Sequence, residues 1–266
     1  MSVLTTMTAY ATARPISGPT LATLIGTTLA AAGALSLNQW WERQADARME
    51  RTRGRPLPQG NLSPSAALRW SVAFTVSGVA VLAWQVNLAA AAAATATILL
   101  YGVVYTPLKR RTRWATEIGA ISGALPALLG NAAAGDLGSR PGLALTAILL
   151  FWQMPHFFAI GWRHRLDYRA AGFPLLPAVD VSGARTAAWS FAYIVLLVVV
   201  SLAPWAMGWL GGIYGAITLC ANAWFLRCGW QFLVGSDRDR TARRLFMASL
   251  FYLPLVMAGL MIEQFG

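Results

Sequence analysis

Long apolar stretches, separated by short polar segments, run along almost the whole chain. A helix needs about 20 apolar residues to cross the hydrocarbon core of a bilayer, and eight stretches approach or reach that length. They cover residues 18–40, 65–86, 88–107, 117–134, 142–163, 186–205, 209–228 and 246–264. The pattern predicts an all-α polytopic membrane protein, with one transmembrane domain over residues 1–266.

Residues 1–13 are apolar as well, but a helix of this length reaches only about 20 Å. The segment has no basic n-region and no clear cleavage site, so we do not interpret it as a signal peptide. We expect it to be the outer half of a first helix whose beginning lies upstream of this sequence. The prediction is therefore eight full transmembrane helices plus a partial first one.

The charged residues indicate which ends of these helices share a side of the membrane. Hydrophobic residues make up 57% of the chain and charged residues 12%, whereas ordinary soluble domains carry about 25% charged residues. Segments 41–69, 108–116, 163–185 and 227–245 contain 19 of the 21 basic residues. Because these segments alternate with the others, the net charge of +11 indicates membrane topology rather than nucleic-acid binding. We expect them on the cytoplasmic side of the cell inner membrane.

Asn38, Glu42 and Asp46 follow one another at intervals of four, which places them on one continuous face of a helix. Mg²⁺ prefers such oxygen ligands and commonly takes one or two carboxylates together with substrate phosphates. The same spacing also occurs where a helix simply ends in water with solvated polar groups, and a short motif alone does not decide between these readings. In either case we expect a water-exposed helix end.

Asn38, Glu42 and Asp46 form an acidic ladder, and the basic residues Arg51 and Arg55 follow it in the sequence. Another basic group includes Lys109, the only lysine, and Arg110. Cations at both places can bind phosphate oxygens directly. The positive-inside rule would place basic residues in these segments without any ligand. Their position on the same side as the acidic ladder is what a diphosphate site requires.

Several motifs together resemble the UbiA-type intramembrane prenyltransferases, in particular the members that farnesylate haem. The similarity comprises residues 38–58, 105–110, 119–130, the run Phe-Trp-Gln-Met-Pro-His-Phe-Phe at 151–158, and residues 167–168 and 174–177. The motifs occur in order and cover most of residues 20–185. The chain departs from the family at Glu42, where Asp is usual.

The resemblance implies a nine-helix bundle that joins the farnesyl chain of farnesyl diphosphate to a vinyl group of haem B and releases diphosphate. It implies Mg²⁺ as cofactor, and a haem A synthase or terminal oxidase assembly as partner in haem O and haem A biosynthesis. The catalytic and metal-binding residues would be Asn38, Glu42, Asp46 and Asp167. The diphosphate would be bound by Arg51, Arg55, Tyr105, Lys109, Arg110, Arg165 and Tyr168.

His156 follows Pro155 inside an apolar stretch, and two roles are open for it. It can hydrogen-bond a backbone carbonyl that the proline leaves without its usual partner. It can also ligate haem iron, as imidazoles commonly do. The resemblance favours the haem contact.

Two other functions remain open at this stage. The acceptor could be a quinone or a chlorophyll-type ring, because the metal ladder would serve the same diphosphate. The protein could also be a small membrane transporter, since polar helix ends and proline-broken helices mark transport sites too. Against transport, eight of the ten acidic residues gather on the predicted cytoplasmic side.

Overall fold

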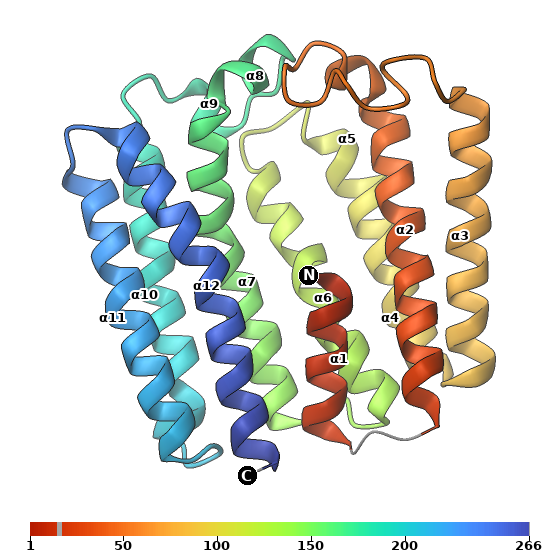
Figure 1. The fold of residues 1–266 in the computed structure, drawn as a ribbon, viewed down its shortest axis with the longest axis vertical. Coiled ribbons are helices and arrows are strands. Elements are labelled where there is room, and N and C mark those ends of the chain that lie inside the picture. Colours follow the sequence, from red (N-terminus) through yellow and green to blue (C-terminus); the bar gives the residue numbers. More distant parts are fainter. Residues whose placement is uncertain (15–17, 266) are drawn as a thin grey trace.

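The apolar stretches fold into upright helices that stand side by side in one bundle (Figure 1). The computed structural model describes residues 1–14 and 18–265. Its helices in chain order are α1 (Ser2–Ala13), α2 (Pro19–Asp46), α3 (Pro64–Gln85), α4 (Leu88–Ile98), the π-helix η1 (Leu99–Tyr105), α5 (Thr106–Leu108), α6 (Ala115–Ala134), α7 (Arg140–Arg163), α8 (Arg165–Ala170), α9 (Leu176–Val179), α10 (Ala184–Ala206), α11 (Gly212–Val234) and α12 (Arg238–Phe265).

The described residues confirm the all-helical class, and six helical segments are long and apolar enough to cross a membrane. These are α2, α3, the continuous segment Leu88–Leu108, α7, α10 and α12. The remaining predicted spans, 117–134 and 209–228, coincide with α6 and with most of α11, which are not among the six.

Several helices continue past the apolar stretches that predicted them. α2 runs on to Asp46 instead of ending at residue 40, α11 runs on to Val234, and α12 begins at Arg238 instead of residue 246. Arg, Gln, Glu and Lys are good helix formers, so a helix does not stop where its apolar stretch stops. Most of the basic segment 227–245 and both ends of the basic segment 41–69, expected between the spans, are therefore helical.

Glycine allows α2 and α3 to pack with their backbones in close approach. A β-carbon added at Gly78 would lie 2.5 Å from the backbone nitrogen of Ala30 and 2.7 Å from the carbonyl oxygen of Gly26. Small residues permit this approach between helices in a membrane, where van der Waals packing drives association. Ser71 adds a hydrogen bond from its hydroxyl to the carbonyl of Gly33, at 2.9 Å. These contacts hold α2 in place.

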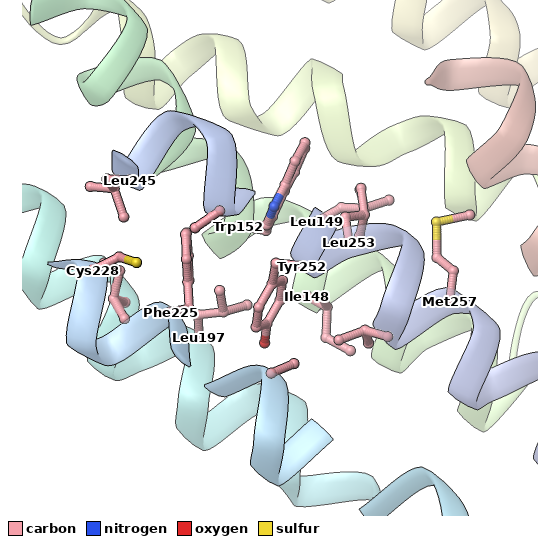
Figure 2. Close-up of a cluster of buried hydrophobic side chains, with 14 of the residues drawn as sticks. Ile148, Leu149, Trp152, Leu197, Phe225, Cys228, Leu245, Tyr252, Leu253 and Met257 are labelled. Carbon is pink, nitrogen blue, oxygen red and sulfur yellow. The ribbon is translucent and has the colours of Figure 1, made fainter. Parts of the chain in front are cut away.

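A buried cluster between α7, α10, α11 and α12 forms the core of the other half of the bundle (Figure 2). Trp152 of α7 donates from its indole nitrogen to the carbonyl of Ser249 on α12, at 2.9 Å. The Tyr252 hydroxyl donates to the Asn222 side-chain oxygen at 2.7 Å, so these polar groups are paired inside the core. The Trp152 contact fixes α7 against α12 one turn from His156.

The segment from Leu88 to Leu108 is one rod interrupted by a π-helical turn. At its end, the N–H of Thr106 bonds to the carbonyl of Tyr101, five residues back. π-helical turns are rare and frequently occur at functional sites. Here the turn brings the Thr106 hydroxyl to 3.1 Å from the side-chain oxygen of Asn38 on α2.

Candidate active site

A polar cavity of about 320 Å³ lies between α2, the end of the Leu88–Leu108 rod, α6 and α7. Its walls include three predicted acidic-ladder residues and three predicted cations, namely Asn38, Glu42, Asp46, Arg51, Arg55 and Lys109. Tyr105 and Tyr168 line it too. The fold therefore brings together residues from four separate parts of the sequence that we predicted as one site.

The expectation that the ladder lies at a water-exposed helix end is wrong. Asn38 is 9% exposed, Glu42 4% and Asp46 1%. The loop after α2 folds back over the helix end, where the Thr52 hydroxyl donates to the carbonyl of Asp46 at 3.0 Å. Met49 in the same loop is 2% exposed. The carboxylates are thus held in a protein interior, where a charge interacts more strongly than in water.

The two carboxylates have specific partners. Lys109 Nζ lies 3.0 Å from Glu42 Oε1, and Asn38 donates to Glu42 Oε2 at 3.3 Å. Arg55 donates to Asp46 Oδ2 at 2.7 Å. The other oxygen of Asp46, Oδ1, is buried and has no hydrogen-bond partner in the described part of the chain. Buried polar atoms are nearly always paired, so this oxygen is a free position for a cationic ligand.

Three aromatic rings surround the ammonium group of Lys109. Its Nζ lies 5.7 Å from the ring centroid of Tyr105, 5.9 Å from that of Tyr168 and 5.2 Å from that of Phe173. Burial by itself lowers the pKa of Lys109, but the neighbouring Tyr105 and Glu42 raise it, and the net pKa lies above the ordinary lysine value. Lys109 is therefore a fixed positive charge in the cavity wall.

Two predicted diphosphate ligands, Arg110 and Arg165, do not line the cavity. The guanidinium of Arg110 reaches the carbonyl of Trp41 at 3.5 Å. Arg165 forms two hydrogen bonds to the carboxylate of Asp239, at 2.8 and 3.2 Å. Both arginines are thus engaged with the protein itself, outside the cavity wall.

Asp167 also lies outside the cavity wall. Its Oδ1 accepts a hydrogen bond from the backbone nitrogen of Glu50 at 3.2 Å, and its Oδ2 is 3.8 Å from His164 Nδ1. Burial and the nearby Arg51 lower the pKa of His164. Asp167 therefore ties α8 to the loop that covers the ladder.

A second cavity, of about 370 Å³, adjoins the first and is lined mainly by apolar side chains of α1, α2, α4, α6 and α7. The two cavities share wall residues on three helices, including Tyr101, Ser122 and Gln153. His156 lines the second cavity only. A polar cavity with carboxylates and cations therefore lies next to an apolar cavity that contains an imidazole.

The side chain of His156 bonds to another helix, not to a carbonyl freed by Pro155. Its Nδ1 lies 2.8 Å from Oγ of Ser249 on α12. Its ring stacks on Trp152, with centroids 5.1 Å apart, and lies 5.1 Å from the ring of Phe246. The first of the two roles open to His156 is therefore not the one seen.

Sequence reasoning missed two polar wall residues, Tyr101 and Gln153, and also Thr106, which contacts Asn38 without lining either cavity. Gln153 donates to the carbonyl of Ala120 at 2.7 Å, and a β-carbon at Gly123 would overlap its side-chain oxygen. Two signals were available: Gln153 is a polar residue within an apolar stretch, and Tyr101 lies one helical turn before Tyr105. The contact of Thr106 with Asn38 had no sequence signal, because it depends on how two helices meet.

Sequence comparison relates the chain to known membrane enzymes. The profile of the UbiA prenyltransferase family matches residues 1–250. A protoheme IX farnesyltransferase of Opitutus terrae is 42% identical over 266 residues, which cover 99% of this chain and 90% of the relative. Another, of Solibacter usitatus, is 41% identical over 246 residues, covering 92% of this chain and 84% of the relative.

Two solved structures share the fold. One, from a study of digeranylgeranylglyceryl phosphate synthase, has a TM-score of 0.80 at 17% identity, covering 99% of this chain and 92% of its own. A UbiA homologue from Archaeoglobus fulgidus, bound to GPP and Mg²⁺, has a TM-score of 0.65 at 13% identity, covering 97% and 95%. At these identities the likeness establishes the arrangement of the helices.

Proposed function

The chain belongs to the UbiA prenyltransferase family, and we propose that it transfers the farnesyl group of farnesyl diphosphate to a vinyl group of haem B, giving haem O. Relatives that are named protoheme IX farnesyltransferases are 42% and 41% identical to it over nearly the full chain. The observation that carries the proposal is the pair of adjoining cavities, one charged and one apolar with a histidine. Family membership disfavours the transporter considered above.

The reaction balances with one water molecule. The bond between the first farnesyl carbon and the diphosphate oxygen breaks, and that carbon bonds to the terminal vinyl carbon. Water adds to the other vinyl carbon, which yields a hydroxyethylfarnesyl side chain and a proton. Negative charge builds on the departing diphosphate, and fixed cations nearby lower the energy of that transition state. We assign this task to Arg51, Arg55 and Lys109, which line the polar cavity.

Asn38, Glu42 and Asp46 fit Mg²⁺, because they offer hard oxygen donors in a buried position and Asp46 Oδ1 has no protein partner among the described residues. Within residues 1–14 and 18–265, no group of three or more His, Cys, Asp or Glu side chains could hold a metal. The remaining ligands would come from diphosphate and water, as is usual for Mg²⁺. When bound, Mg²⁺ neutralises charge on the diphosphate. The Archaeoglobus homologue with GPP and Mg²⁺ supports this assignment.

The other predicted site residues support this centre from its margins. Tyr105 and Tyr168 hold the Lys109 ammonium between their rings. Asp167, rather than ligating metal, would position the covering loop through the Glu50 N–H. Arg110 and Arg165, which bond to protein groups, would hold the rim of the cavity without touching the diphosphate.

His156 is our candidate for the haem contact. It is the only histidine among the residues that line the apolar cavity. Coordination of the iron by its imidazole would hold the haem in the apolar cavity, next to the polar cavity where the diphosphate would be bound. A quinone acceptor carries no metal that an imidazole could ligate.

We propose that α6 and α11 also span the membrane, giving eight full spans in addition to α1. α6 has 20 residues, a length of about 30 Å, and packs against α1, α4 and α7, so its side chains face protein more than lipid. The four basic segments would lie in the cytoplasm, at the inner membrane. The product would pass to a haem A synthase or a terminal oxidase assembly.

The decisive experiment is expression in a bacterial host that lacks haem O, followed by chromatography and mass analysis of extracted haems. We expect haem O from the wild-type chain and none from an Asp46→Asn variant at matched membrane level. Haem B alone in both samples would contradict the proposed acceptor. A prenylated quinone in place of haem O would move the function to the rival acceptor class.

A further inference from the structure

A second basic site lies away from the two cavities, on α11 and α12. A groove of about 680 Å³ is lined by four arginines and two large aromatic residues, together with neutral neighbours. The charged and aromatic members are Trp224, Arg227, Arg240, Arg243, Arg244 and Phe251. Among the residues that the structure describes, no acidic residue lines the groove. It is a concave surface with strong positive charge.

Helix periodicity produces this convergence. On α12 the lining residues Arg240, Arg243 and Arg244 are followed by Met247 and Phe251, a spacing that keeps them on one face. Trp224 and Arg227 lie on one face of α11 in the same way. The positive-inside rule requires basic residues near these helix ends but no convergence of side chains from two helices. The groove therefore needs an explanation beyond topology.

The acidic residues near the groove bond to groups other than the side chains of the groove arginines. Asp239 pairs with Arg165 at 2.8 Å, and Asp237 accepts from the backbone nitrogen of Arg240 at 2.9 Å. Within the described residues, no ion pair or hydrogen bond engages the guanidinium groups of the four groove arginines. Four like charges in one groove repel one another, and an anionic ligand would relieve that repulsion.

The charged and the aromatic residues of the groove lie at different depths along the membrane normal. α11 runs towards the end of the bundle that carries α8 and α9, and α12 runs away from it (Figure 1). The arginines of α12 lie in its first two turns, and Phe251 lies about 10 Å further along than Arg244. The rings of Trp224 and Phe251, 6.3 Å apart, join the two helices below the charges. Charge therefore lies at the rim and aromatic surface below it.

We propose that this groove binds an anionic phospholipid, with its phosphate between the arginines and an acyl chain along Trp224 and Phe251. Basic pockets between transmembrane helices bind such head groups, and guanidinium groups match phosphate oxygens well. On a helix that turns 100° per residue, Ser249 projects about 140° from Arg244. The lipid site therefore lies on the other side of α12 from His156 and does not rest on the proposed reaction.

The test is native mass spectrometry of the delipidated full chain with added phosphatidylglycerol, phosphatidylcholine or inorganic phosphate. The groove variant is Arg240→Gln/Arg243→Gln/Arg244→Gln. Its control, Arg48→Gln/Arg69→Gln/Arg111→Gln, removes the same charge from exposed arginines outside the groove. At about fivefold per arginine, we expect phosphatidylglycerol binding to weaken about 100-fold in the groove variant and little in the control. Phosphatidylcholine binding should be weak and equal in all three proteins.

Three results would overturn the proposal. An equal loss of phosphatidylglycerol binding in both triple variants would mean that the lipid is attracted by the net charge of the protein and not by the groove. Equal affinity of the wild type for phosphatidylglycerol and phosphatidylcholine would mean that the negative charge of the lipid head group does not contribute to binding. Binding of inorganic phosphate as tight as that of the lipid would assign the site to a free anion. If the triple variant does not fold, Arg243→Gln alone should weaken phosphatidylglycerol binding about fivefold, with Arg111→Gln as control.

Discussion

The Nδ1 atom of His156 lies 2.8 Å from Oγ of Ser249, and this contact determines which nitrogen of the neutral imidazole carries the hydrogen. The serine hydroxyl has one hydrogen, and it donates that hydrogen to the carbonyl of Phe246 at 2.5 Å. Ser249 must then accept from Nδ1–H, which leaves the lone pair of a neutral His156 on Nε2. Histidines that ligate metals commonly donate their other N–H in this way. Ser249 is therefore a positioning residue for the proposed haem contact.

We predict that Ser249→Ala weakens haem binding without affecting farnesyl diphosphate binding. Loss of one hydrogen bond of this kind is worth about 1 kcal/mol, or about fivefold in haem affinity. Haem titration followed at the Soret band measures the effect. Ser190→Ala is the matched control, because that buried hydroxyl has no partner among the described residues. Equal haem affinities in the two variants would mean that Ser249 does not position His156.

His156→Ala should abolish the haem-induced Soret shift and reduce transfer to haem. The mutation removes the nitrogen that would coordinate iron, whereas the diphosphate cavity does not include this residue. Farnesyl diphosphate affinity, measured by calorimetry, should therefore remain at the wild-type value. If haem binds with an unchanged spectrum and only the melting temperature falls, His156 serves packing against Trp152 and Phe246.

Much of the fold could be predicted because the bilayer imposes a simple length requirement on apolar stretches. The bounds of α3, α7 and α10 differ from prediction by at most two residues, since polar residues flank these apolar stretches closely. The ends of α2 and α12 were predicted less well. Arg and Glu continue a helix as readily as apolar residues do, so hydropathy cannot show where such a helix stops.

The ladder of the site followed from helix spacing, but its burial did not. Glu42 and Asp46 are covered by a loop that the sequence describes only as basic and rich in proline and glycine. The contact of Ser249 with His156 joins residues 93 apart, on helices whose relative rotation no local pattern specifies. The resemblance implied Arg110 as a diphosphate ligand beside Lys109, but Arg110 lies in the turn after α5 and reaches the carbonyl of Trp41 instead.

Asp46→Asn should lower farnesyl transfer at least about 100-fold while the protein still folds. The amide keeps the shape of the side chain but removes the charge that faces Arg55 and the free oxygen position for Mg²⁺. Activity in membranes, normalised to protein amount, measures the loss. Asp136→Asn changes an exposed acid at the other end of the bundle and should remain active. Wild-type turnover in Asp46→Asn would exclude this carboxylate from the metal site.

Lys109 should act as a permanent cation over the working pH range. Its raised pKa means that the folded protein binds the proton more tightly than the unfolded chain does. The resulting stabilisation is complete below the unfolded value of about 10.4 and is lost only as the pH rises through the higher folded value. We expect that raising the pH from about 7 to about 9.5 does not titrate Lys109 and so leaves its contribution to diphosphate affinity intact.

Lys109→Met then tests whether this charge binds diphosphate. We expect affinity for farnesyl diphosphate to fall at least about tenfold, because the phosphate oxygens lose the charge-assisted hydrogen bonds that a buried cation donates to them. Lys109→Arg should not restore it, since a planar guanidinium cannot occupy the space between three rings that holds a compact ammonium. Arg111→Gln removes a charge from the same segment outside the cavity and is the control. If Arg111→Gln lowers affinity as much as Lys109→Met does, the basic segment attracts diphosphate only through its net charge, and the assignment of Lys109 to the site is wrong.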